Sequence, residues 1–312
     1  MNDSLINHSK LHWIDLLDPQ PKDFEIVAKE NNIHPEAMID CLDPEHLPKH
    51  ELLAEFNFLI LRAYDPEANR KSDSVQGLTR KLAVFYKKGR VITVHRKQHA
   101  YIKEIYSKYL DSNALSDECY SRVVYDLVSA VIKSFESGVK QLFDQFDDFE
   151  QQVFSQDRTQ LRLQNSYILK RRVALIKRVL RMNLDAIEDA LIPQGIEFEI
   201  KLQNVKDLMS KLVFQLDEIR DGLTALLNLQ ISLVSQKTNE ASRKTNEVVR
   251  VLTIFSVFVM PLNFIASFYG MNFKFMPELD WQYGYLLVLG LMVLVEATVY
   301  FWFRKKGWLS GI

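Results

Sequence analysis

The chain has 312 residues, about twice the usual length of a domain, and this predicts two structural units. Its 19 Phe and 12 Tyr, against only 10 Gly and 9 Pro, exclude a collagen-like or disordered chain. The net charge of -1 gives no strongly basic field for nucleic acid, and the two cysteines, Cys41 and Cys119, are too few for a disulfide framework.

The first hundred or so residues alternate between strand and helix patterns. Short apolar runs predict four strands, at residues 13–19, 56–64, 82–86 and 91–94, the last two joined by a turn containing Gly89. Residues 24–31 and 35–42 predict short helices, and the polar residues 65–77 predict a surface loop. This mixture predicts an α/β fold for the N-terminal part.

Residues 98–192 have a helical pattern throughout, with a helix start at Ser116 and a helix end at Pro193 and Gly195. Beyond residue 195, apolar residues recur at alternating spacings of four and three: Val205, Met209, Leu212, Leu216, Ile219, Leu223 and Leu226. This seam predicts packing against neighbouring helices. No turn signal follows, so one helix from residue 196 to about 268 is expected, roughly 110 Å long.

A second face of this helix carries small uncharged groups. It comprises Asn228, Ser232, Ser235, Asn239, Ser242 and Asn246, and it continues as Val249, Leu252, Ser256, Met260 and Asn263. A face packed on another polar helix and the wall of a water-filled path both fit this pattern. A path needs a symmetric ring of chains, because one helix cannot enclose it.

Two C-terminal segments are apolar enough to span a membrane. Residues 251–270 contain no charge, and residues 283–303 contain only Glu296, which is costly in lipid. Lys and Arg precede the first segment and follow the second, at Arg243, Lys244, Arg250, Arg304, Lys305 and Lys306. Positive charge favours the cytoplasmic side, so both termini are expected in the cytoplasm and the loop at 271–282 outside.

The loop carries a recognisable motif. The first span ends in Tyr269-Gly-Met-Asn272, followed by Phe273 and Met276-Pro-Glu-Leu279, and the strings KTNEVVRVLTI and FRKKGWL flank the two spans. This arrangement resembles the CorA family of divalent-cation channels, two-span proteins with a Gly-Met-Asn motif. The resemblance is strong from about Asn239 to Leu309 and weaker upstream.

The resemblance implies a homopentameric funnel in which the first spans line the pore. It makes Asn272 the main selectivity residue, together with Tyr269, Gly270 and Met271 at the outer mouth. It makes Leu252 and Met260 apolar constrictions, with Asn246, Val249, Ser256 and Asn263 as further pore-lining residues. Glu278 and Asp280 are expected either to attract cations to the mouth or to be surface charges without a role.

Two departures from the family pattern concern the pore and its regulation. Asn263 stands where Thr is common in the family. Asn228 stands where some members place an Asp that helps bind a regulatory divalent ion, which puts that sensor in doubt here. Inhibition by Mg²⁺ is then expected to be weaker than in members with a stalk Asp, or to rely on surface acids such as Asp65, Asp144 or Asp148.

The sequence and the resemblance together predict an α+β membrane protein: an N-terminal α/β and helical domain at 1–195, a stalk at 196–250, spans at 251–270 and 283–303, an outer loop at 271–282 and a basic tail at 304–312. We expect a gated channel for Mg²⁺, with Co²⁺ and Ni²⁺ as further ions, in the inner or plasma membrane. Mg²⁺ is its substrate and a candidate regulatory ligand, and its partners are its own copies and lipid. It is expected to have no cofactor and no enzymatic activity.

Two alternatives stay open. One is a Zn²⁺ transporter of the same fold, the ZntB branch, which tends to carry Ile in place of Met271. The other is a membrane-tethered helical scaffold without flux, against which the uncharged helix face and the Gly-Met-Asn loop both count. Two histidine pairs, His46/His50 and His95/His99, are weak candidates for a zinc site because Pro48 interrupts the first and His95 ends a predicted strand.

Overall fold

The computed structural model describes residues 3–8, 11–53, 55–69, 72–110, 119–154, 163–191, 196–272, 276–277 and 281–308. It divides into two compact units, Met1–Leu229 and Gln230–Ile312. The division falls inside one helix, α7 (Ile196–Tyr269), which contributes residues to both units. Each unit is therefore described separately.

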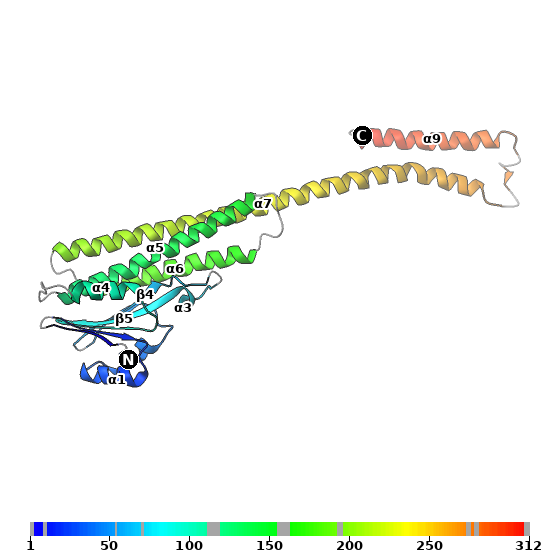
Figure 1. Cartoon of the computed structure of the whole chain (residues 1–312). Helices are drawn as coiled ribbons and strands as arrows, with labels where there is room; N and C mark the ends of the chain where they lie inside the picture. Colours follow the sequence, from blue (N-terminus) through cyan, green and yellow to red (C-terminus); the bar gives the residue numbers. More distant parts are fainter. Residues whose placement is uncertain are drawn as a thin grey trace. The chain divides into compact units, whose positions relative to one another are not determined.

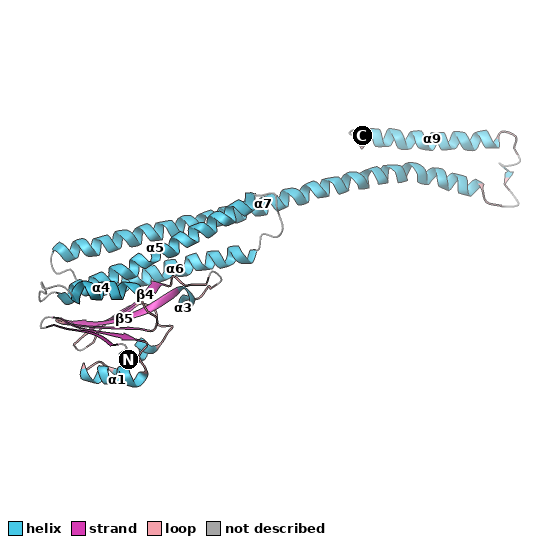
Figure 2. Ribbon diagram, viewed as in Figure 1, coloured by secondary structure: helices cyan, strands magenta, loops and turns pink. Residues whose placement is uncertain are grey.

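The first unit contains a six-stranded sheet of order β1-β2-β6-β5-β4-β3 (Figure 2). The strands are β1 (Asp3–His8), β2 (Leu11–Leu17), β3 (Lys49–Leu52), β4 (Asn57–Tyr64), β5 (Thr79–Lys87) and β6 (Arg90–His95). Only β2 and β6 pair in parallel, and the other neighbours are antiparallel. The four predicted strands are confirmed with small shifts in their bounds. The two edge strands, β1 and β3, were not predicted, because short polar segments give no apolar pattern.

Both faces of the sheet are covered. On one face, Phe58, Ile60 and Phe85 pack with residues of α1 (Pro21–Glu30) and α2 (Pro35–Leu42). On the other face, alternate residues such as Leu59 and Leu61 join the core formed with the long helices. Burial on both sides explains why β4 is nearly all apolar, as in a central strand. The predicted loop at 65–77 is largely confirmed, but it ends in a short helix, α3 (Val75–Leu78).

Long helices form the rest of this unit: α4 (Ala100–Leu110), α5 (Cys119–Phe154), α6 (Leu163–Ala190) and the first part of α7 (Figure 1). All seven residues of the predicted seam, from Val205 to Leu226, are buried in the core that these helices share. An ion pair of 2.5 Å between Lys177 on α6 and Asp217 joins α6 to α7. The expected helix signals at Ser116, Pro193 and Gly195 lie outside the described residues.

One buried side chain ties α6 to the sheet. Asn183 is fully buried; its Oδ1 accepts from the backbone N–H of Arg62 at 3.0 Å, and its Nδ2 donates to the Arg62 carbonyl at 2.9 Å. Strand β3 pairs with β4 only as far as the Lys49–Ile60 pair, so at Arg62 the edge of β4 extends past its neighbour. Asn183 therefore supplies the hydrogen bonds that a neighbouring strand would otherwise provide.

Replacing Asn183 with Leu should leave two buried backbone groups unpaired and destabilise this unit by about 2–4 kcal/mol. Thermal unfolding followed by circular dichroism on the purified full chain would show a lower midpoint. Asn204→Leu, at an exposed position on α7, is the control and should change the midpoint little. Equal midpoints for the two variants would contradict the edge-capping role of Asn183.

Candidate ion-conducting pore

Two helices have the length and composition to cross a membrane: α7, in its C-terminal part, and α9 (Gly284–Lys305). Of the most apolar window of each helix, 0% and 6% respectively is buried inside the structure. A core helix of a soluble protein would be mostly buried, so this exposure disfavours that explanation. The apolar surfaces of both helices are open to a surrounding solvent, which for such residues is lipid or another chain.

Helix α9 lies beside the C-terminal part of α7 in the second unit (Figure 1). The rings of Phe258 on α7 and Phe303 on α9 are 5.9 Å apart, and Phe303 is only 1% exposed. A shallow groove between the helices is lined by Phe258 and Leu262 and, from α9, by residues around Glu296. Phe303 therefore anchors the two helices, a role not predicted from the sequence. Its position in an aromatic run with Trp302 was the available signal.

The uncharged face of α7 lies opposite this contact. At about 100° per residue, Val249, Leu252, Ser256, Met260 and Asn263 fall within roughly 40° of a common direction. Phe258 and Leu262 point about 160° and 120° away from that direction, toward α9. The five residues of the face are all exposed, with Leu252 at 63% and Met260 at 71%. The structure thus leaves the predicted pore-lining face free on this chain.

The same face continues toward the N-terminus of α7 with hydroxyl and amide groups. Asn228, Ser232, Ser235, Asn239, Ser242 and Asn246 are all exposed. Ser232, Ser235 and Asn239 line a shallow groove that Glu240 and Arg243 also border. Within the membrane segment, the Ser256 hydroxyl donates to the Leu252 carbonyl at 2.8 Å, which leaves its oxygen facing outward as an acceptor.

Helix α7 ends immediately before the Gly-Met-Asn motif. The Gly270 N–H donates to the Ala266 carbonyl at 3.0 Å, and the Met271 N–H donates to the Phe268 carbonyl at 3.4 Å. Gly270 does not adopt the left-handed backbone conformation that favours glycine. A Cβ at residue 270 would instead lie 3.1 Å from the Ala266 carbonyl oxygen. A side chain would therefore crowd this helix end.

The predicted selectivity residue is accessible. Asn272 and Met271 are exposed directly after the helix end, while Tyr269 is half-buried, with its ring centre 5.6 Å from that of Phe268. Asn272 thus follows the same helix that carries the uncharged face. The predicted outer-mouth acids, Glu278 and Asp280, lie outside the described residues.

The three acids considered for regulation have different environments. Asp65 is 2% exposed and pairs with Arg80 at 2.7 Å and with Lys97 at 3.0 Å. Burial acts to raise the pKa of Asp65, but hydrogen bonds from these two cations outweigh it and lower the pKa. Asp65 is therefore a structural ion-pair partner, and the suggestion that it is a surface acid is wrong. Asp144 and Asp148 are exposed on α5.

Within the described part of the chain, no group of three or more His, Cys, Asp or Glu residues is placed to hold a metal ion. His95 Nε2 instead contacts Asp15 Oδ1 at 3.0 Å, and His50 Nε2 contacts Asn57 Oδ1 at 3.2 Å. Each histidine pair thus has a member engaged in a local structural contact.

Glu296 on α9 has one buried carboxylate oxygen, Oε1, without a hydrogen-bond partner in the structure.

Comparison with known proteins identifies the family and supports the fold. The chain matches the family described as CorA-like Mg²⁺ transporter protein over residues 8–305, which includes strands β2 to β6, the long helices and both candidate spans. The chain belongs to this family. It is a membrane transporter of the CorA type, and its two apolar helices and its Gly-Met-Asn loop are consistent with that membership.

The relatives support this assignment along the whole chain. The cobalt/magnesium transport protein CorA of Thermotoga maritima is 28% identical to this chain. The alignment covers 97% of this chain and 83% of the length of the relative. The CorA magnesium transporter of Methanocaldococcus jannaschii has a similar structure, with a TM-score of 0.63 at 20% identity, covering 97% of this chain and 94% of its own. The ZntB cytoplasmic domain of Vibrio parahaemolyticus has a TM-score of 0.58 at 13% identity, covering 73% of this chain and 90% of its own.

These comparisons confirm the predicted fold class: an N-terminal α/β domain, a long helix and two C-terminal apolar helices. At such low identities the solved structures show the fold alone.

Proposed function

We propose that the protein forms a homopentameric channel that admits Mg²⁺ to the cell, with a ring of Asn272 side chains selecting the ion at the outer mouth. The observation that carries this proposal is the continuous uncharged face of α7, exposed on the side opposite α9. One helix cannot enclose a path, so the face requires symmetric copies around an axis. The match to the CorA-like family and the CorA name of the Thermotoga relative support the same conclusion.

The chemistry of the ion explains why amides suit this task. Mg²⁺ holds its octahedral waters tightly and dehydrates reluctantly, so a filter that stripped them would conduct slowly. Carboxamide oxygens of Asn272 accept hydrogen bonds from those waters and sort ions by hydrated size. Below this ring, Asn263, Ser256 and Asn246 offer further neutral oxygens. Leu252 and Met260 form apolar constrictions that close the pore by dewetting.

Orientation and ion preference complete the proposal. The Lys and Arg residues flanking the spans favour an orientation with both termini in the cytoplasm and the Asn272 loop outside, in the inner or plasma membrane. Co²⁺, named for the Thermotoga relative, and Ni²⁺ are proposed as further permeant ions. Glu278 and Asp280 raise the local cation concentration at the mouth. Transport, without enzymatic chemistry or a resident cofactor, is what the family membership supports.

The competing function is Zn²⁺ transport. The likeness to the ZntB cytoplasmic domain favours it only at the level of fold. Flux into liposomes distinguishes the two: Mg²⁺ entry without a pH gradient supports the channel. Zn²⁺ entry that is faster than Mg²⁺ entry and depends on a pH gradient would favour the alternative. Absence of both fluxes in reconstituted, correctly assembled protein would favour the scaffold.

The first prediction concerns assembly. The detergent-solubilised protein should have a mass of about five times the 36.4 kDa of one chain, because the free face of α7 must be closed by copies. Light scattering with correction for bound detergent measures this mass. A stable monomer or dimer would contradict the pore.

A further prediction concerns regulation at the stalk. The uncharged face from Asn228 to Asn246 presents no carboxylate, and neutral amides bind a strongly hydrated divalent ion weakly. Asn228→Asp adds one carboxylate per chain, so internal Mg²⁺ should inhibit uptake at a several-fold lower concentration than in the unmodified protein. Uptake measured against internal Mg²⁺ tests this, with Asn204→Asp on an exposed position of α7 as the matched control. Superimposed inhibition curves would remove Asn228 from any regulatory site.

A further inference from the structure

The N-terminal unit contains a cavity of about 180 Å³ that the transport function does not use. It lies where the carboxyl ends of β2 and β6 meet the loop after α2. Six of its lining residues are basic or histidine: Arg62, Arg80, Lys81, His95, Arg96 and Lys97. None of the lining residues is Asp or Glu. We call this space the basic cavity.

Three of its cations form a row across adjacent strands. Arg62 on β4 is directly opposite Lys81 on β5 in the antiparallel register, and Arg96 is the first residue after β6, the next strand. Like charges placed directly opposite each other destabilise a sheet. Burial, together with the like charges of Arg62 and Arg96, lowers the pKa of Lys81 to about 8. The row therefore has an electrostatic cost that its neighbours must offset.

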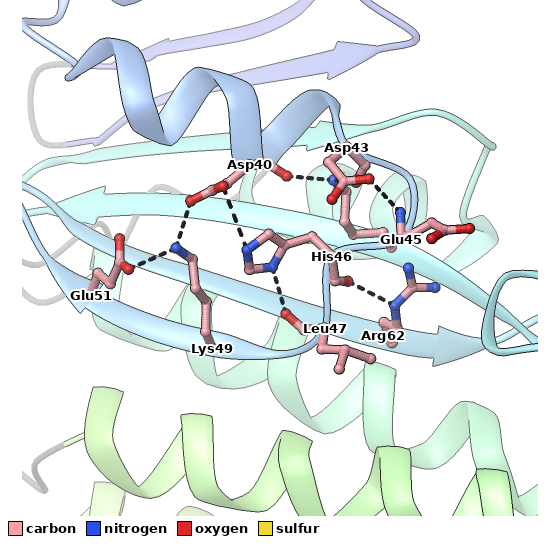
Figure 3. A network of polar contacts seen from close by, with 9 residues as sticks. Asp40, Asp43, Glu45, His46, Leu47, Lys49, Glu51 and Arg62 are labelled. Carbon is pink, nitrogen blue, oxygen red and sulfur yellow. Dashed lines mark hydrogen bonds and ion pairs between the residues drawn. The ribbon is translucent and has the colours of Figure 1, made fainter.

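Backbone carbonyls contact these cations, whereas carboxylates do not. Arg62 is 1% exposed, and its Nε donates to the His46 carbonyl at 3.0 Å (Figure 3). Its other two nitrogens donate to the Thr79 hydroxyl and the Pro44 carbonyl, which accounts for three of five N–H groups. Carbonyls satisfy these donors but supply no net charge.

The same holds for the other two cations of the row. The Lys81 ammonium donates to the carbonyls of Asp40, at 2.7 Å, and Asp43, while Arg96 donates to the Leu42 carbonyl at 2.6 Å. The Asp40 carboxylate is used elsewhere, because it pairs with Lys49 at 2.6 Å (Figure 3). Among the described residues, no carboxylate lies within ion-pair distance of the row.

Other nearby groups compensate only part of the charge. The carboxyl end of α2 contributes about half a negative charge. Asp43 and Glu45 act on Arg62 from exposed positions, where water screens them. Burial raises the pKa of Cys41 in the cavity wall to about 12, so its thiol stays neutral.

One of the remaining cations carries a hydrogen-bond donor without a partner in the structure. The charges of Arg80 and Lys97 are balanced by the buried Asp65, but the Arg80 Nε is buried without an acceptor. The cavity therefore contains three cations whose charge is largely uncompensated and a buried donor that has no partner. Arg62 is buried, Lys81 is half-buried and Arg96 is exposed, so the charge of Arg62 gains most from an accompanying anion.

We propose that the basic cavity binds a phosphate-type oxyanion, which bridges Arg62, Lys81 and Arg96 and supplies their missing counter-charge. Arginine suits this ligand because its planar guanidinium matches the spacing of phosphate oxygens. The volume is below the roughly 300–1,000 Å³ of sites that enclose drug-sized ligands. The cavity therefore accommodates free phosphate or the terminal phosphate of a nucleotide whose base stays outside.

The proposal is tested by titration calorimetry of the full chain in detergent with inorganic phosphate and no divalent ion. One saturable site per chain is expected. Lys81→Gln and Arg96→Gln should each weaken binding at least tenfold. Lys88→Gln, which removes one exposed charge from the turn between β5 and β6, should stay within twofold of the unmodified protein. Arg62 is left unchanged, because its loss would disturb the loop that it anchors.

Proton uptake gives a second readout. At pH 8 about half of the Lys81 side chains are neutral, and a bound anion raises their pKa, so binding should take up to about half a proton per chain. The charged and titratable groups that face Lys81 and modify its pKa are Arg62, Arg96, Asp43 and Cys41. Titrations in two buffers of different ionisation enthalpy measure the uptake, which Lys81→Gln should abolish.

Titration with ATP and AMP separates the two sources of phosphate. Tighter binding of inorganic phosphate supports free phosphate as the ligand, and tighter binding of ATP supports a nucleotide. No saturable binding of any of them, or equal weakening by Lys88→Gln and Lys81→Gln, would overturn the proposal. The result is independent of transport, because the readout is binding.

Discussion

Asn272→Ala is expected to reduce Mg²⁺ uptake at least tenfold while leaving expression and oligomer size unchanged. The substitution removes one carboxamide per chain from an exposed position just beyond the end of α7, where no packing depends on it. Five copies of the loss would remove the ring of oxygens that receives the hydrated ion. Uptake into liposomes loaded with a Mg²⁺-sensitive dye measures the effect.

Two variants make this result specific. Asn272→Gln keeps a carboxamide on a longer side chain and should retain more uptake than Asn272→Ala. Asn204→Ala removes an exposed amide from α7 outside the uncharged face and should behave like the unmodified protein. Uptake by Asn272→Ala at the unmodified rate would exclude Asn272 as the selectivity residue.

The membrane potential is expected to drive accumulation of the ion without another energy source. Moving two charges through 100 mV is worth about 4.6 kcal/mol, which corresponds to an equilibrium accumulation of about 2,000-fold. Liposomes with a potassium diffusion potential, negative inside, should accumulate Mg²⁺. Collapsing the potential should stop uptake when the two concentrations are equal.

This experiment also separates a channel from a coupled carrier. Accumulation that continues without a potential but follows a pH gradient would indicate proton coupling and contradict a passive pore. Liposomes containing the Asn272→Ala protein serve as the control for leakage, because the bilayer and the protein content are matched.

Much of the helical architecture followed from the sequence because helical patterns are local. The four- and three-residue spacing from Val205 to Leu226 predicted a buried seam, and all seven residues are buried. The apolar segments predicted two spanning helices, and α7 and α9 have the length and composition for this. Helix α2 begins and ends at the predicted residues, since Pro35 starts it and the apolar pattern stops at Leu42.

Strand pairing was less accessible from the sequence. Strands β1 and β3 are short and polar, and they become strands by hydrogen bonding to β2 and β4. Their formation depends on a neighbour elsewhere in the chain rather than on their own composition. The parallel contact of β2 with β6 joins segments that lie about 80 residues apart, and no local pattern announces it.

The candidate pore and the basic cavity differ in the same way. The uncharged face of α7 lies on one helix, where a repeat of three and four residues places side chains on the same side. The residues that share this face could therefore be identified from the sequence alone. Only the tertiary structure showed that α9 covers the opposite side. Arg62, Lys81 and Arg96 come from three strand regions, and Asp65 meets Arg80 and Lys97 across a loop. Their proximity, and hence which charges are compensated, was decided by sheet register and chain packing, because electrostatic contacts depend on distance in space.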